Sequence, residues 1–140
     1  QIYNSSGGTP LIRHSLEGGS GGTGAGWDSS LGTDGGGNLD ADPQFTDAAL
    51  GNLRLQLTSP AIDAGDNSAL PADSVDLDGD GDTFEATPFD LDSNPRRVDI
   101  PDVPDIGIGP PPIVDLGAYE VQGETQEELP VYLPLILRKH

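Results

Sequence analysis

Residues 53–66 read LRLQLTSPAIDAGD, and this stretch shows how the chain builds its structure. Leu53, Leu55 and Leu57 alternate with polar residues, which is the two-residue period of a half-buried β-strand. Pro60 ends that strand, because proline cannot donate to a sheet ladder. Residues 61–66 then form a second short element that finishes in a turn at Gly65. The stretch therefore predicts short strands separated by tight turns.

The same pattern extends over the whole chain of 140 residues, of which 20 are glycine and 13 are proline. This density breaks helices, so it argues against a helical bundle and a doubly wound α/β fold. Further strands are predicted at residues 9–16, 97–100 and 113–120. Short strands with turns every ~8–12 residues indicate an all-β sandwich, barrel or β-solenoid. The long glycine-rich loop at residues 17–26 favours the solenoid, in which each coil rests on its neighbour.

Five short blocks follow one another in a recognisable order: DPQF at 42–45, LRL at 53–55, SPAIDAGD at 59–66, DLDSNPR at 90–96 and DLGAYE at 115–120. They resemble the C-terminal region of bacterial surface proteins with right-handed parallel β-helix repeats, the choice-of-anchor Q type. The resemblance covers residues 38–121. It implies an all-β fold made of the last coils of a right-handed parallel β-helix, with long glycine-rich and acidic loops.

The resemblance also implies a domain division and a location. We expect a β-helix C-terminal domain over residues 1–121, and a linker with an extended hydrophobic tail over residues 122–140. The resemblance implies an exported or cell-surface protein, but it supplies no enzyme mechanism because the family is defined by its scaffold. The chain contains no methionine, so we expect it to be processed from a longer exported precursor.

The charge balance restricts the partners. The chain carries 24 acidic and six basic residues, which gives a formal net charge of −18. Such a surface repels phosphate backbones and anionic lipid, so we expect no nucleic-acid partner. No run approaches the ~18 apolar residues that span a bilayer, so we expect no membrane span. A metal cation is the natural partner of this chain.

The acidic segment at residues 73–92 predicts a calcium loop. Asp76, Asp78 and Asp80 occupy positions 1, 3 and 5 of the run DLDGDG, and Gly81 at position 6 permits a sharp turn. An EF-hand would need glutamate at position 12, which here is Thr87, so a calcium loop with another closure is favoured. The closing ligand is left open among Asp82, Glu85, Asp90 and Asp92. The predicted metal ligands are Asp76, Asp78, Asp80, Asp82 and Glu85.

The alternative interpretation of this segment is a solvated acidic turn. Packing these aspartates so closely without a counter-ion would cost repulsion, which favours calcium. Oxygen-only ligands also favour calcium over zinc or copper. Four further aspartates could build a second site, although capping of turns is the commoner use of aspartate. They are Asp40, Asp42, Asp63 and Asp66.

Candidates for catalysis or sugar binding are weak. His14 lies on a predicted strand face with Ile12 and Leu16, which favours a structural role. No serine lies in a nucleophile elbow, and we expect no enzyme activity. Trp27 could stack on a sugar, or it could anchor the glycine-rich loop. The alternative function is a carbohydrate-binding or polysaccharide lyase-like β-helix module, whose candidate bases would be Arg13, Arg54, Arg96 and Arg97.

The most hydrophobic segment lies at residues 129–137, where Pro130 and Pro134 predict an extended conformation. We expect this segment to cover the open end of a neighbouring copy, which would produce a head-to-tail filament or a larger assembly. Alternatively it folds back on its own chain or tethers the protein to the envelope. The predicted assembly residues are Val131, Tyr132, Leu133, Leu135, Ile136 and Leu137.

Together these features predict a non-enzymatic, extracellular or cell-surface protein with a structural or adhesive role. Calcium would stabilise it, and its main partner would be another copy of itself. A polysaccharide of the cell envelope or of the extracellular matrix is the second predicted partner.

Overall fold

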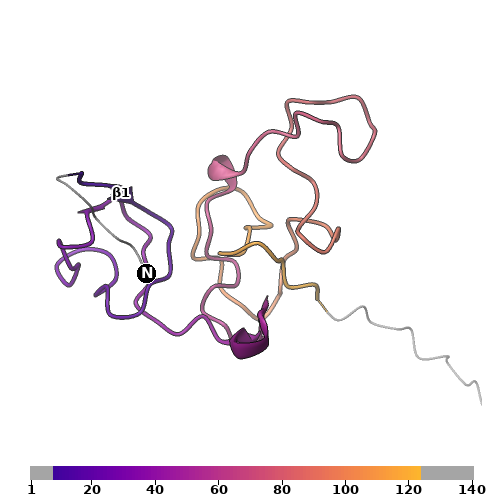
Figure 1. Ribbon diagram of the computed structural model, residues 1–140. Coiled ribbons are helices and arrows are strands. Elements are labelled where there is room, and N and C mark those ends of the chain that lie inside the picture. Colours follow the sequence, from indigo (N-terminus) through magenta and orange to yellow (C-terminus); the bar gives the residue numbers. More distant parts are fainter. Residues whose placement is uncertain (1–7, 124–140) are drawn as a thin grey trace, which may run out of the picture.

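The computed structural model describes residues 8–123 as a chain of loops joined by a few short regular elements (Figure 1). Strand β1 (Leu11–Ile12) pairs in parallel with β2 (Thr33–Asp34), and β3 (Phe45–Asp47) pairs antiparallel with β4 (Asn52–Leu55). Two short 3₁₀ helices complete the set, η1 at Ala48–Leu50 and η2 at Asn67–Ala69. None of the helices in this part of the chain is long and apolar enough to cross a membrane.

The predicted β-helix is wrong. Residues 8–123 are mostly irregular, with two small two-stranded sheets and no solenoid or closed sheet. The strands expected at residues 97–100 and 113–120 do not form, because side chains bind backbone amides that a strand ladder would need. The carboxylate of Glu120 accepts hydrogen bonds from the amides of Val98 and Asp115, at 3.0 and 3.1 Å. The strand predicted from Leu53 is confirmed as β4, although it ends at Leu55.

The N-terminal part of the described chain is held by a short parallel ladder. The amides of Thr33 and Gly35 donate to the carbonyl oxygens of Pro10 and Ile12, at 2.8 and 2.7 Å. An isolated bridge between Leu16 and Leu39 extends the contact. Parallel pairing of this kind is what neighbouring coils of a β-helix show, but within residues 8–123 it consists of this one pair of strands and two isolated bridges, Leu16–Leu39 and Asp66–Ile108.

Carboxylates order the glycine-rich loop, which lacks regular structure of its own. The amide of Gly24 donates to Asp34 at 2.8 Å, and the amide of Gly19 donates to Asp40 at 2.6 Å. Glycine is needed at Gly21, where φ is +77° and a Cβ atom would overlap the Gly26 carbonyl. The loop is thus a packed structure in which two aspartates replace a sheet neighbour.

The core lies where the SPAIDAGD segment meets residues 113–116. Ala61, Ile62, Ile113 and Val114 are all buried. The amide of Gly65 donates to the Val114 carbonyl at 2.8 Å, which holds the two segments side by side. So small a core gives limited hydrophobic stabilisation, so polar contacts must carry much of the fold.

The five sequence blocks converge on this core although the expected β-helix does not form. The Ser59 hydroxyl donates to the Pro43 carbonyl at 2.7 Å, and Arg54 Nε donates to Asp92 at 2.6 Å. The amide of Glu120 donates to Asp90 at 3.0 Å. The blocks are therefore parts of one packed unit, and their order along the chain reflects contacts between distant segments.

Candidate metal centre

The acidic loop at residues 73–85 is closed at its base by a short antiparallel contact. Ala72 and Ala86 form an isolated bridge, and the Asp73 amide donates to the Glu85 carbonyl at 2.8 Å. This pairing places Asp73 opposite Glu85 at the neck of the loop. The rest of the loop projects from the core, in pink at the upper right of Figure 1.

Within the loop, each of the alternating aspartates closes a turn with a single oxygen. Asp76 Oδ1 accepts from the Gly81 amide at 3.1 Å, and Asp78 Oδ1 accepts from the Asp80 amide at 3.2 Å. Asp80 Oδ1 accepts from the Asp82 amide at 2.7 Å. Each of Asp76, Asp78 and Asp80 therefore keeps a second oxygen that makes no hydrogen bond in the described structure.

Two overlapping groups of these carboxylates could hold a metal ion. Asp76, Asp78 and Asp80 bring one oxygen each within 4.8 Å of one another, and so do Asp73, Asp78 and Glu85. Exposed acidic groups are common without an ion, so the first group decides little by itself. The second group is more telling because Asp73 is only 1% exposed.

Asp73 and Glu85 each leave an oxygen buried without a hydrogen-bond partner. Asp73 Oδ2 accepts from the Leu77 amide at 2.7 Å, whereas Asp73 Oδ1 and Glu85 Oε1 have no partner among the described residues. A buried carboxylate oxygen without a donor is costly, and a bound cation removes that cost. The neck of the loop thus has the donor set of an oxygen-ligated cation site.

The electrostatics of the loop point in the same direction. Partial burial raises the pKa of Glu85, and the neighbouring charges of Asp78, Asp80, Asp82 and Asp73 raise it further. Repulsion among like charges disfavours the ionised form of Glu85 unless a positive charge is added. A cation held between these carboxylates would reverse that effect.

The structure brings together most of the predicted ligands and adds one. Asp76, Asp78, Asp80 and Glu85 belong to the two groups, but Asp82 does not, and its Oδ1 accepts from the Phe84 amide at 2.9 Å. Asp73 was missed because only the pairing across the neck of the loop identifies it. No local motif in the sequence announces that pairing.

The other candidate closing ligands serve elsewhere. Asp90 Oδ1 accepts from the amides of Asp92 and Asn94, at 2.8 and 2.9 Å. Asp92 forms an ion pair with Arg54, whose guanidinium also lies 4.5 Å from the centre of the Tyr119 ring. Neither aspartate belongs to a candidate cation group in the described chain.

Of the four aspartates considered for a second site, two cap turns and one binds a distant loop. Asp40 binds the amides of the glycine-rich loop, as described above, and Asp42 accepts from the Gln44 amide at 2.9 Å. Asp66 accepts from the Ser68 amide at 2.9 Å and caps η2. Asp63 is different, since it is fully buried and its carboxylate has no hydrogen-bond partner.

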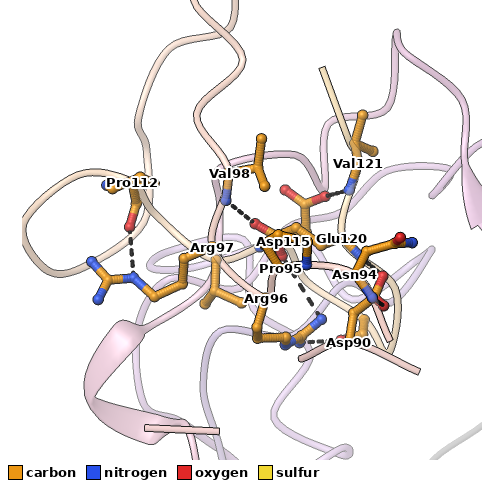
Figure 2. A network of polar contacts seen from close by, with 12 residues as sticks. Asp90, Asn94, Pro95, Arg96, Arg97, Val98, Pro112, Asp115, Glu120 and Val121 are labelled. Carbon is orange, nitrogen blue, oxygen red and sulfur yellow. Dashed lines mark hydrogen bonds and ion pairs between the residues drawn. The ribbon is translucent and has the colours of Figure 1, made fainter. Parts of the chain in front are cut away.

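A separate network of buried carboxylates holds the core together (Figure 2). Asp115 accepts from the amides of Asp63 and Val121, at 2.9 and 2.7 Å. Burial raises the pKa of Glu120 to about 8, and the nearby Asp115 adds to the shift. The Arg96 guanidinium lies 3.8 Å from Glu120 and opposes it. These carboxylates already have backbone donors, so their role is to organise the backbone.

Several of the side chains considered for catalysis or sugar binding form hydrogen bonds with the protein backbone. Arg96 donates to the Gly117 carbonyl at 2.6 Å, and Arg97 donates to the Pro112 carbonyl at 3.0 Å. Trp27 is half-buried and its indole N–H donates to the Gly32 carbonyl at 2.8 Å. His14 is half-buried and its Nδ1 has no partner. The indole contact fits a loop anchor, and sugar binding at Trp27 stays a prediction.

The predicted assembly residues Val131, Tyr132, Leu133, Leu135, Ile136 and Leu137 lie outside the described residues. Comparison with known proteins adds no relative: no family model matches the chain, and neither a curated protein nor a solved structure shows significant similarity. Inferences about function therefore depend on the chain's own residues.

Proposed function

We propose that this chain is a non-enzymatic structural domain that calcium stabilises, working outside the cell or at its surface. The observation that carries the proposal is the neck of the acidic loop. There the buried Asp73 and the half-buried Glu85 leave carboxylate oxygens unpaired beside Asp78. A bound cation would join the two sides of the neck and order the projecting loop.

Calcium is the cation that this donor set favours. All the candidate ligands are carboxylate oxygens, which suit hard cations, and calcium accepts six to eight of them in flexible geometry. Weak calcium sites in extracellular modules have Kd values of about 10⁻⁴–10⁻³ M, which suits an exposed loop. The extracellular setting rests on the resemblance of the five sequence blocks to bacterial surface proteins.

Calorimetric titration with calcium tests this proposal. The parent chain should bind calcium, and Asp78→Asn should weaken binding at least tenfold because Asp78 belongs to both groups of the loop. Asp82→Asn is a matched control, since it removes one charge from the same loop but leaves both groups intact. It should retain affinity to within about threefold, the part due to general charge. Equal losses in the two variants would show that only net charge matters and would contradict the site.

Self-association is the second part of the proposal. An apolar groove of about 440 Å³ opens on the described surface, with Leu57, Ile62, Val103 and Ile106 among its lining residues. This groove supplies the kind of surface that an apolar segment such as residues 131–137 of another copy covers. The contact would be head-to-tail and would build a ring or a filament.

Sedimentation of calcium-loaded protein tests this second part. The full chain should form large particles, and a chain that ends at Gln122 should stay monomeric while remaining folded. Monomers in both samples would contradict self-association without affecting the calcium site. Particles in both would show that association does not use residues 131–137.

A further inference from the structure

A second group of carboxylates lies outside the acidic loop, and one of its members, Asp63, belongs to the core. Asp63 is 0% exposed, and its backbone is fully engaged. Its amide donates to Asp115 at 2.9 Å, and its carbonyl accepts from the amides of Ile106 and Gly107, each at 3.0 Å. Neither oxygen of its carboxylate has a hydrogen-bond partner among the described residues.

Two further carboxylates face this buried side chain. Asp63, Asp99 and Asp105 each bring an oxygen within 4.8 Å of the others. Asp99 and Asp105 are exposed, and neither side chain makes a hydrogen bond or an ion pair in the described part of the chain. The group therefore consists of one buried carboxylate and two surface carboxylates, with no positively charged side chain paired to any of them among the described residues.

The charges around Asp63 make this arrangement unfavourable without a ligand. The pKa of Asp63 is raised to about 6, mainly by burial and then by the negative charges of Asp115, Asp105 and Asp99, while the Ile100 amide lowers it. A buried charge is normally paired or coordinates a metal ion. No positively charged side chain is among the groups that shift this pKa.

We propose that Asp63, Asp99 and Asp105 form a second site for a divalent cation of the calcium type. Three carboxylate oxygens are hard ligands, and an ion among them would satisfy the buried oxygens of Asp63 and remove the repulsion between the three side chains. The site shares no residue with the loop at 73–85, so it goes beyond the calcium dependence proposed for that loop.

Binding at this site would have a structural consequence. Asp63 belongs to the core segment, whereas Asp99 and Asp105 begin and end a proline-rich loop. An ion that bridges them ties residues 99–105 to the core. The same loop and segment supply Val103 and Ile62 to the apolar groove, so the ion would also fix two walls of that groove relative to one another.

Equilibrium dialysis against radioactive calcium tests the proposal through the number of ions bound per chain. Asp99→Asn/Asp105→Asn changes only exposed residues, and it should bind one ion fewer than the parent. Asp102→Asn is the matched control, because Asp102 is an exposed aspartate of the same loop outside the group. It should bind as many ions as the parent. Asp63→Asn is less useful, since it alters a buried side chain and could impair folding.

Hydrogen exchange supplies a second measurement. Calcium should slow exchange in peptides covering residues 99–107 at least tenfold in the parent, and should not do so in Asp99→Asn/Asp105→Asn. The triple variant Asp76→Asn/Asp78→Asn/Asp80→Asn should lose the loop ions but keep this protection.

The outcomes separate the two sites. If Asp99→Asn/Asp105→Asn binds as many ions as the parent, or if calcium leaves exchange at residues 99–107 unchanged, the second site is overturned. Asp63 is then a buried carboxyl group that binds no ion. If the triple loop variant binds as many ions as the parent, the loop proposal fails while the Asp63 site stands.

Discussion

Carboxylates accept hydrogen bonds from backbone amides both in the acidic loop at residues 73–85 and in the network around Asp115, but the two regions differ in burial and in how many of the oxygens are hydrogen-bonded. In the network, Asp115 is 3% exposed and both its oxygens accept backbone amides. In the loop, Asp76 and Asp78 each accept one amide and keep one oxygen without a hydrogen bond. The carboxylate oxygens of Asp115 are therefore all hydrogen-bonded without a ligand, whereas Asp76 and Asp78 each have an oxygen that could bind one.

This difference indicates how a chain with few apolar residues can fold. Hydrophobic residues make up 34% of the sequence, and few of them are fully buried. Buried carboxyl groups replace part of the missing core by accepting hydrogen bonds from backbone amides that would otherwise be buried without a partner. Exposed carboxylates also accept backbone amides, as Asp40 does, but those of the acidic loop keep oxygens without a hydrogen bond that a cation could bind.

The largest expected effect comes from breaking the network. Asp115→Ala leaves the buried amide of Asp63 and the half-buried amide of Val121 without an acceptor, and a buried unpaired group costs about 1–3 kcal/mol. We expect a loss of roughly 2–5 kcal/mol in the free energy of unfolding, measured with urea at saturating calcium. Asp102→Ala, an exposed substitution, should change it by less than about 0.5 kcal/mol. Similar losses in both variants would mean that the network does not stabilise the core.

Calcium removal should affect the loop and spare the network. At a free calcium concentration about 100-fold above Kd, binding adds about 2.7 kcal/mol to the free energy of unfolding. Urea unfolding with calcium and with chelator should show this difference in Asp99→Asn/Asp105→Asn, which lacks the second proposed site, and little of it when Asp78→Asn is added to that variant. Amide exchange at Val121 should be slow in both conditions, provided that the protein remains folded. Loss of that protection on chelation would contradict the separation of the two regions.

The raised pKa of Glu120, in the network, should make the free energy of unfolding depend on pH. Its pKa is raised from 4.5 to about 8, so the folded chain binds its proton more tightly than the unfolded chain does. The stability that this proton supplies is complete below about pH 4.5 and is lost as the pH rises through about 8. Calcium-free parent protein should therefore lose stability relative to Glu120→Gln between about pH 5 and pH 8.

Chemical denaturation at several pH values measures this difference. Glu17→Gln provides the control, since the Glu17 carboxylate makes no hydrogen bond in the described residues. If parent and Glu120→Gln lose stability in parallel, Glu120 is ionised in the folded protein throughout.

The smallest expected effect lies on the surface, at the ion pair between Arg54 and Asp92. Two guanidinium nitrogens donate to the two carboxylate oxygens, and the guanidinium also lies over the Tyr119 ring. Arg54→Lys keeps the charge but loses the paired geometry, so we expect a cost below about 1 kcal/mol that shrinks at high salt. Arg13→Lys, at an exposed position, should cost nothing measurable. A larger cost at Arg54 would make this pair part of the network.

Local patterns predicted part of the structure and of the site. Alternation of leucines located β4, and the spacing of Asp76, Asp78 and Asp80 located a group of carboxylates that the structure does bring together. The use of aspartate as a turn cap was also foreseeable, and Asp66 is an example. These features depend on neighbours within a few residues, which is why a pattern in the sequence can report them.

Long-range pairing was not predictable in the same way. The β-helix expectation failed because the amides at Val98 and Asp115 bind Glu120, and no local pattern shows which side chain will reach a given amide. Asp73 was missed for the same reason, since its role depends on the bridge between Ala72 and Ala86.

The sequence by itself determined the acidity of this protein, its lack of helix-forming stretches and the position of one loop whose carboxylates could hold a metal ion. These properties follow from composition and from spacing within a few residues. Only the tertiary structure decided which carboxylates are buried with donors, as at Asp115, and which are buried without them, as at Asp63. Burial and partner depend on segments that are tens of residues apart, and the free energy of a carboxylate depends on both.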